Sequence, residues 1–194
     1  NLAAITQQDL KRLLAYSTVA HSGYVLLGIL SMNRDGYAGA VFYALSLLVM
    51  KLTAFLVVVK VACNGRNPQL DDLAGLHRRS PLLALALMVS LFSLAGIPPT
   101  IGFAGKFLVF VAAMERGYFT LVLIAMVNVV ISLYYYLLVI KAAYLQEPAE
   151  AQPALRLSPA MSLLTGGLIV AMVLGGFFPN PLIELAIAAS KAIL

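Results

Sequence analysis

Long apolar runs alternate with short polar stretches along the whole chain. The apolar runs cover residues 13–30, 37–62, 82–114, 118–140 and 159–178. Each run is long enough for an α-helix to cross the hydrocarbon core of a bilayer, which takes about 17–25 residues. The pattern therefore predicts an all-α membrane protein, a polytopic transmembrane helical bundle of about five spans.

The third apolar run is interrupted in its middle by the sequence AGIPPTIG at 95–102. As one helix its residues would extend roughly 50 Å, which overshoots a bilayer core of about 30 Å, whereas either half alone is too short to cross. Pro98 and Pro99 remove two backbone donors, and Gly96 and Gly102 admit non-helical angles. We predict one discontinuous span with non-helical backbone between Gly96 and Gly102. Such breaks are typical of ion pathways in transporters.

The polar stretches predict the remaining elements. Residues 63–80 predict a turn and a short interfacial helix capped by Asp71 or Asp72, and residues 141–158 predict a loop. Residues 181–194 are too short to span and predict a C-terminal amphipathic interfacial helix. Its apolar stripe comprises Leu182, Ile183, Ala186, Ile187, Ser190 and Ile193.

Composition excludes several classes of protein. Only 11% of residues are charged, against about 25% in soluble domains. The net charge of +5 comes from basic residues in loops, which form no basic face for a nucleic acid. The single cysteine, Cys63, excludes an internal disulfide and a cysteine metal site, and no His/Cys/Asp/Glu cluster has metal-ligand spacing.

Basic residues are distributed unequally between the two predicted sides of the membrane. Three of them, Arg34, Arg116 and Lys191, fall on the side that holds the C-terminus. The positive-inside rule then predicts that residue 1 lies on the cytoplasmic side and the C-terminus on the periplasmic side. The eight basic residues on the predicted cytoplasmic side are Lys11, Arg12, Lys60, Arg66, Arg78, Arg79, Lys141 and Arg156.

Two lysines remain inside the predicted spans and are the strongest chemical signal. Lys51 lies roughly 20 Å along its helix from either end, too far for its stem to reach the interface, and Lys106 lies one turn after the break. Ionisable groups inside a membrane are functional by default, and desolvation favours the neutral form of a lysine, which can then take up and release a proton. With water and His21, the two lysines predict a proton relay. Polar residues predicted to support it are Tyr43, Ser46, Thr53 and Ser93.

Structural interpretations stand beside these functional ones. Either lysine can pair with a carboxylate outside this chain, and His21 can simply hydrogen-bond a neighbouring helix. Pro98 and Pro99 can kink a helix without breaking it. The tyrosine run 134–136, near the end of a span, is more typical of an aromatic belt at the membrane interface than of a pathway.

Five motifs carry a resemblance to a known family. They are DLKRLLAYST at 9–18, HSGY at 21–24, DLAGL at 72–76, LAGIPP at 94–99 and GFAGKF at 102–107. They resemble the antiporter-like membrane subunits of respiratory complex I, bacterial NADH:quinone oxidoreductase, and most closely those of the N (chain-2) type. Tyr43 and Leu47 stand where L-type subunits have histidines, and Lys106 stands where M-type subunits have a glutamate.

The resemblance implies an organisation and a function. Residues 1–194 would be a single membrane domain, the second antiporter-like repeat plus the last helix, and because the first residue is Asn we expect the C-terminal part of a longer chain. Lys51 would be the central-axis lysine, and Lys106 the lysine that exchanges protons with the periplasmic side. The chain would translocate protons as a subunit of an enzyme whose redox chemistry lies elsewhere.

The same resemblance implies cofactors and partners. NADH, FMN, iron–sulfur clusters and quinone would be bound by other subunits, with no cofactor or metal in this chain. M-type and K-type subunits would be its neighbours in the bacterial inner membrane. Two other functions stay open: a subunit of a multi-subunit cation/proton antiporter, and a purely structural subunit of the membrane arm.

Overall fold

A computed structural model describes residues 1–62, 66–148 and 153–191, so Cys63 and the inferences drawn from it lie outside the described residues. Helices form nearly all of the regular structure within these ranges, where the β structure is one isolated bridge between Asp9 and Gln69. In chain order the elements are α1 (Leu2–Ile5), α2 (Leu10–Leu30), α3 (Arg34–Val61), the 3₁₀ helix η1 (Leu70–Leu73), α4 (Leu76–Arg79), α5 (Pro81–Ala95), α6 (Ile101–Glu115), α7 (Phe119–Leu145), α8 (Pro159–Phe177) and α9 (Asn180–Ser190).

The predicted set of spans is confirmed. Helices α2, α3, α7 and α8 are each long and apolar enough to cross a membrane. The fifth span is the broken one, made of the 15-residue helices α5 and α6. The chain is thus an all-α, multi-pass membrane protein.

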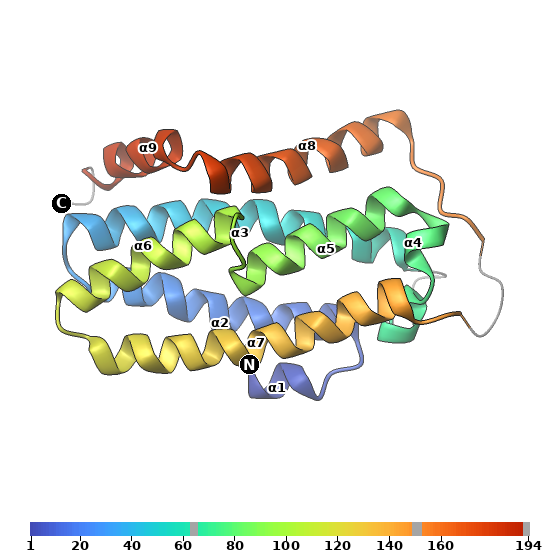
Figure 1. The fold of residues 1–194 in the computed structure, drawn as a ribbon, viewed down its shortest axis with the longest axis horizontal. Coiled ribbons are helices and arrows are strands. Elements are labelled where there is room, and N and C mark those ends of the chain that lie inside the picture. Colours follow the sequence, from blue (N-terminus) through green and yellow to red (C-terminus); the bar gives the residue numbers. More distant parts are fainter. Residues whose placement is uncertain (63–65, 149–152, 192–194) are drawn as a thin grey trace.

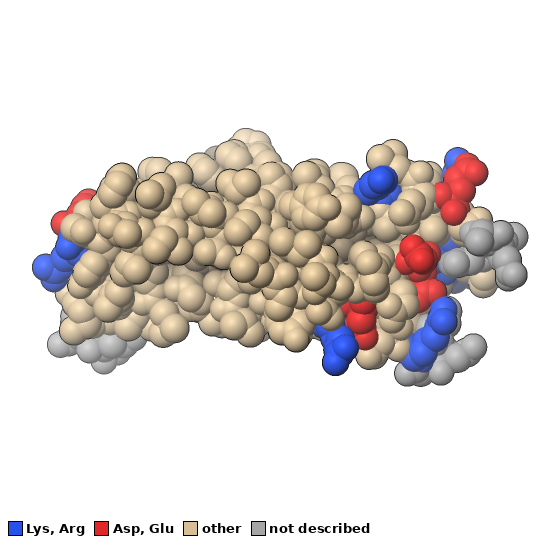
Figure 2. All heavy atoms as spheres, turned by 90° about the horizontal axis from the view of Figure 1, so that it is seen from below, with Lys and Arg blue, Asp and Glu red and all other residues tan. Residues whose placement is uncertain are grey.

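The spans lie side by side along one long axis, with α3 at the centre of the bundle (Figure 1). Helices α5 and α6 follow one another along α3, and α2, α8 and α9 also pack against it. On the face seen in Figure 2 the charged side chains gather toward the two ends of the bundle, with a wide uncharged band between them. This distribution is what a bilayer requires, because an exposed charge in hydrocarbon is costly.

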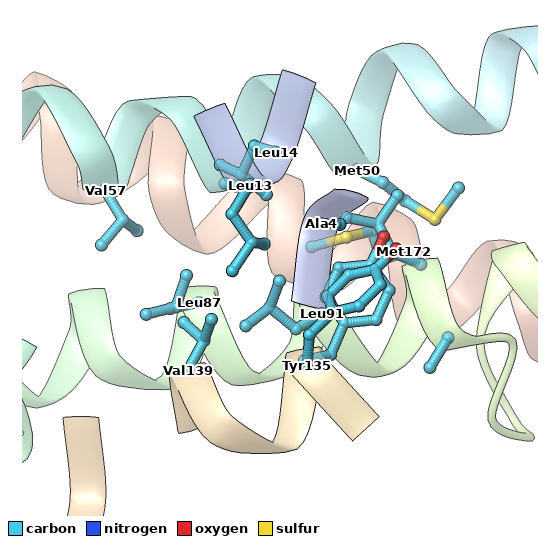
Figure 3. Packing of buried hydrophobic residues seen from close by; sticks show 14 of the residues in the cluster. Ala4, Leu13, Leu14, Met50, Val57, Leu87, Leu91, Tyr135, Val139 and Met172 are labelled. Atoms are coloured by element: carbon cyan, nitrogen blue, oxygen red, sulfur yellow. The ribbon is translucent and has the colours of Figure 1, made fainter. Parts of the chain in front are cut away.

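Apolar side chains from helices along the whole chain fill the interior. Leu13 of α2, Val57 of α3 and Leu87 of α5 are essentially inaccessible to solvent. Figure 3 shows them converging with residues of α7 and α8 on one interior. Since lipid is as apolar as leucine, van der Waals packing of these side chains, rather than exclusion of water, holds the helices together.

Several boundaries differ from the prediction. Helix α7 continues through Lys141–Leu145, where a loop was expected, because these residues favour helix and the first proline after them is Pro148. Helix α6 ends at Glu115, one residue beyond the predicted run 82–114. The connection before α5 holds two short elements, η1 and α4, instead of one, and the expected cap is present as a capping box between Gln69 and Asp72.

The C-terminal helix α9 packs against α3. Ala186 and Ser190 of the predicted stripe are buried, and Ile183 and Ile187 are partly buried. Leu182 is exposed, so the packed face is narrower than the predicted stripe. Ile193 lies outside the described residues.

Candidate functional site

The break in the third span has a defined local structure. Helix α5 ends at Ala95, and Gly96 adopts a left-handed conformation with φ of 84°. Helix resumes at Ile101, and the backbone N–H of Gly102 donates a 3.1 Å hydrogen bond to Oγ of Ser93. Any Cβ on Gly102 would collide with the carbonyl of Ser93. The glycine therefore allows α6 to begin directly against the end of α5, with Ser93 joining the two half-helices.

Lys106 extends from α6 back to this break and is 4% exposed. Its Nζ donates to the carbonyl oxygens of Leu94, at 2.8 Å, and Ala95, at 3.0 Å, and lies 5.2 Å from the centre of the Tyr24 ring. The last carbonyls of a helix carry partial negative charge, and an aromatic face also attracts a cation. The ammonium is therefore held by the end of α5 and by Tyr24.

Lys51 has a comparable environment near the middle of α3. Its Nζ donates to the carbonyl of Leu14 at 3.0 Å and to the hydroxyl of Ser17. Within the described residues, ion pairs join only Arg66 to Asp72 and Arg78 to Glu147. Neither intramembrane lysine thus has a carboxylate partner there, and backbone and hydroxyl dipoles hold both charges.

His21 is buried and lies on α2 between Ser17, which contacts Lys51, and Tyr24, which contacts Lys106. Its Nδ1 is 2.6 Å from the hydroxyl of Tyr43, and its Nε2 is 3.0 Å from the hydroxyl of Tyr136. A neutral imidazole donates from one nitrogen and accepts at the other, and hydroxyls do both. The triad can therefore reverse the direction of its hydrogen bonds, which is the property a proton path needs.

One face of α2 brings these groups into line. Ser17, His21 and Tyr24 are spaced by four and three residues, so they share a helix face over roughly 10 Å. Ser17 bonds Lys51, His21 bonds the two tyrosines, and the ring of Tyr24 faces Lys106. Helix α2 thus supplies a contact at each lysine and a titratable group between them.

The other predicted polar residues have more local contacts. The hydroxyls of Ser46 and Thr53 donate to Phe42 and Val49 of their own helix, at 2.8 Å each, so their part in a relay stays a prediction. Ser93 acts at the break, as described above.

The tyrosine run is where the structure departs most from the sequence interpretation. Tyr134 is 56% exposed, as expected of a belt residue, but Tyr135 and Tyr136 are buried, and Tyr136 contacts His21. The belt interpretation was wrong for these two, because position along the span does not reveal which side of α7 faces the bundle. Ser17, Tyr24 and Tyr136 were missed as site residues. The spacing of Ser17 and Tyr24 around His21 was the signal that could have found the first two.

An apolar cavity of about 430 Å³ adjoins Lys106. Phe103, Phe107 and Phe110 of α6 and a row of α7 residues line it, together with Gly96. In the described ranges no group of three or more His, Cys, Asp or Glu side chains has the arrangement of a metal site. The site is therefore built from lysines, a histidine, hydroxyls and backbone carbonyls.

Comparison with known proteins places this pattern in a family. Residues 1–132 match the family described as NADH:quinone oxidoreductase/Mrp antiporter, transmembrane. NADH-quinone oxidoreductase subunit N 2 of Syntrophobacter fumaroxidans is 74% identical over 194 residues, covering 100% of this chain and 41% of that protein. The chain thus spans about two fifths of the length of this relative.

Two solved structures have the same fold. A chain of respiratory complex I from Thermus thermophilus with bound aureothin superposes with a TM-score of 0.83 and 34% identity over 94% of this chain and 41% of its own. A chain of the Mrp complex from Dietzia superposes with a TM-score of 0.88 and 25% identity over 98% of this chain and 44% of its own. The resemblance inferred from the motifs is confirmed, and the chain belongs to the NADH:quinone oxidoreductase/Mrp antiporter transmembrane family.

Proposed function

We propose that this chain is part of a proton-translocating membrane subunit of NADH:quinone oxidoreductase. One observation carries the proposal: two intramembrane lysines, Lys106 buried and Lys51 partly buried, have no carboxylate partners among the described residues and contact the same face of α2, on either side of His21. The names of its relatives give the enzyme. Residues 1–194 would form one membrane domain, an antiporter-like repeat with the last helix.

In this mechanism the two lysines load and release protons in turn. Quinone reduction elsewhere in the enzyme changes the charge pattern along the membrane arm. Lys51 takes a proton and passes it through water, Tyr43 and His21 to Lys106, which releases it on the periplasmic side. The half-helix α5 ends at Lys106, so its carbonyls hold the charged state until the release path opens.

The redox groups belong to other subunits in this proposal. NADH, FMN, iron–sulfur clusters and quinone would be bound there, and M-type and K-type membrane subunits would flank this one in the bacterial inner membrane. Two observations test this assignment. The full-length protein should co-purify with these subunits, and the redox groups should stay with the peripheral subunits when the membrane arm is dissociated. A redox group that stays with this subunit would contradict it.

The proposed orientation places the end of the bundle near Arg78 in the cytoplasm and the end near Lys191 in the periplasm. Both side chains are exposed, so a cysteine at either position is accessible to a reagent. In a Cys63→Ser background, Lys191→Cys should react with an impermeant maleimide added outside intact cells, and Arg78→Cys only after the cells are opened. The reverse pattern would invert the orientation.

Substitutions of Lys106 test the function itself. Arginine keeps the charge but does not deprotonate near neutral pH, so a proton carrier fails with either Lys106→Ala or Lys106→Arg. We expect both variants to lose most proton pumping in membranes at matched subunit abundance, while the exposed control Lys141→Ala pumps normally. Full pumping by Lys106→Arg would leave Lys106 as a fixed charge, and full pumping by Lys106→Ala would reject the function.

The second candidate is a subunit of a multi-subunit cation/proton antiporter, favoured by the superposition on a chain of the Mrp complex. The two functions differ in their driving reaction. Pumping driven by NADH oxidation supports the first. Sodium-dependent proton movement that persists without NADH supports the second.

A further inference from the structure

The buried hydroxyl of Tyr24 differs from the other buried polar groups of the described residues because it makes no hydrogen bond. Tyr24 is 4% exposed, and among the described residues its hydroxyl is the buried side-chain polar group without a hydrogen-bond partner. Buried polar groups are almost always paired, because an unpaired one keeps the cost of leaving water and gains nothing in return. A phenylalanine would fill the same space without that cost. The Asn1 side chain lies close enough to influence this hydroxyl but makes no hydrogen bond with it, so the hydroxyl is free to bind a water.

The ring of Tyr24 lies inside the candidate proton path. It faces Nζ of Lys106 at 5.2 Å and packs edge-to-face against His21, with ring centres 5.7 Å apart. A second edge-to-face contact, at 5.9 Å, joins it to Phe110 of α6. Tyr24 is thus next to both titratable groups at this end of the path.

On its other side Tyr24 lines a groove of about 710 Å³ between α2 and α7. The groove wall is otherwise apolar, except for Asn1 and Asn128, which are hydrogen-bonded to each other at 2.8 Å. A bound water needs roughly 10–15 Å³ of such a volume and two to four polar partners. The groove has room for several waters, and the three polar residues are the ones on its wall that would hold them.

We propose that the hydroxyl of Tyr24 binds water in this groove and passes protons between that water and Lys106. This assigns Tyr24 as a further catalytic residue and rests on the proposed function. In each step the phenol oxygen accepts a proton that leaves Lys106 through one water, as its own proton leaves to a second water in the groove. One O–H bond forms and one breaks, so Tyr24 ends neutral.

The test is Tyr24→Phe in the complete enzyme complex, because this substitution deletes one atom and keeps the ring over Lys106. If the hydroxyl has no part in proton transfer, pumping should be unchanged, because removing an unpaired polar group does not destabilise the fold. We expect proton pumping to fall about tenfold at matched subunit abundance. The control Tyr144→Phe deletes the same atom from a tyrosine that stacks on His77, outside the path, and should pump normally.

Lys106→Ala in the same assay separates the two levels of the argument. If Lys106→Ala abolishes pumping and Tyr24→Phe pumps like the wild type, the assignment of Tyr24 is wrong and the proposed function stands. If Lys106→Ala also pumps normally, the proposed function itself fails.

A density map of the intact complex provides a test without activity. We expect a water within about 3 Å of the Tyr24 hydroxyl, the usual distance for an O–H···O hydrogen bond. A protein side chain bonded to the hydroxyl in place of water would overturn the proposal.

Discussion

A methyl group added at Gly96 would meet Lys106 directly. The Cβ of an alanine at this position would lie 3.0 Å from Cδ and 3.3 Å from Nζ of Lys106. Both distances are shorter than ordinary van der Waals contacts, so the lysine must move away. Its hydrogen bonds to Leu94 and Ala95, at 2.8 and 3.0 Å, leave little room for that movement. Gly96→Ala therefore displaces the ammonium without altering its chemistry.

Two costs add up in this variant. A non-glycine residue in the left-handed conformation of Gly96 costs about 1–2 kcal/mol. Hydrogen bonds from a charged donor contribute about 1.5–3 kcal/mol each, and a shift of a few tenths of an ångström weakens both without breaking them. If half of one bond is lost at the step that loads Lys106, about 1.4 kcal/mol, pumping falls about tenfold.

Gly117→Ala is the matched control for this prediction. Gly117 has nearly the same conformation, with φ of 82°, but no heavy atom lies within 4 Å of its added Cβ. It therefore carries the backbone cost alone. Measured as NADH-driven proton uptake by membrane vesicles at matched subunit abundance, Gly96→Ala should pump about tenfold less than Gly117→Ala. Equal pumping by the two variants would refute the idea that the position of the Lys106 ammonium limits the rate.

Two further substitutions probe the rest of the path. His21→Phe keeps an aromatic ring but removes the hydrogen bonds to Tyr43 and Tyr136. We therefore expect at least a tenfold loss of proton pumping, with assembly of the complex checked by native electrophoresis. Near-normal pumping would remove His21 from the path. Ser93→Ala removes the bond to the Gly102 N–H, which costs about 1 kcal/mol and should lower the temperature at which the purified complex loses this subunit. An unchanged temperature would mean that Ser93 does not join the half-helices.

Most of the fold could be predicted because the bilayer restricts it so strongly. A span must have a certain length and must satisfy its own backbone, so apolar run length and the pair Pro98-Pro99 were enough to place the spans and the break. The end of α7 was missed because Lys141–Leu145 lacks a residue that stops a helix, and a change in composition was taken for a boundary. Composition limits where a helix crosses but not how far it extends into water.

The candidate site was less predictable, for a physical reason. A lysine within an apolar span stands out in the sequence because placing its charge in a membrane is energetically unfavourable. Lys51 and Lys106 were identified in this way. A tyrosine or serine side chain can be placed in many environments at little cost in free energy, so the residue type does not reveal its role. Tyr136 reaches His21 only because of how α7 is rotated against α2, and that rotation depends on packing between residues 115 positions apart. Only spacing relative to a known site residue, as for Ser17 and Tyr24 around His21, carries such information.

The spacing of contacts along α2 has a consequence for how many charges the path can hold. If the two ammonium groups are as far apart as the α2 residues they contact, roughly 10 Å, they repel by about 1.6 kcal/mol at an effective dielectric constant of about 20. Occupancy of one lysine then makes simultaneous occupancy of the other more than tenfold rarer. In the proposed path, a proton arriving at Lys51 would then favour release of the one on Lys106, and the charges would advance one at a time without a moving gate at the centre of the chain.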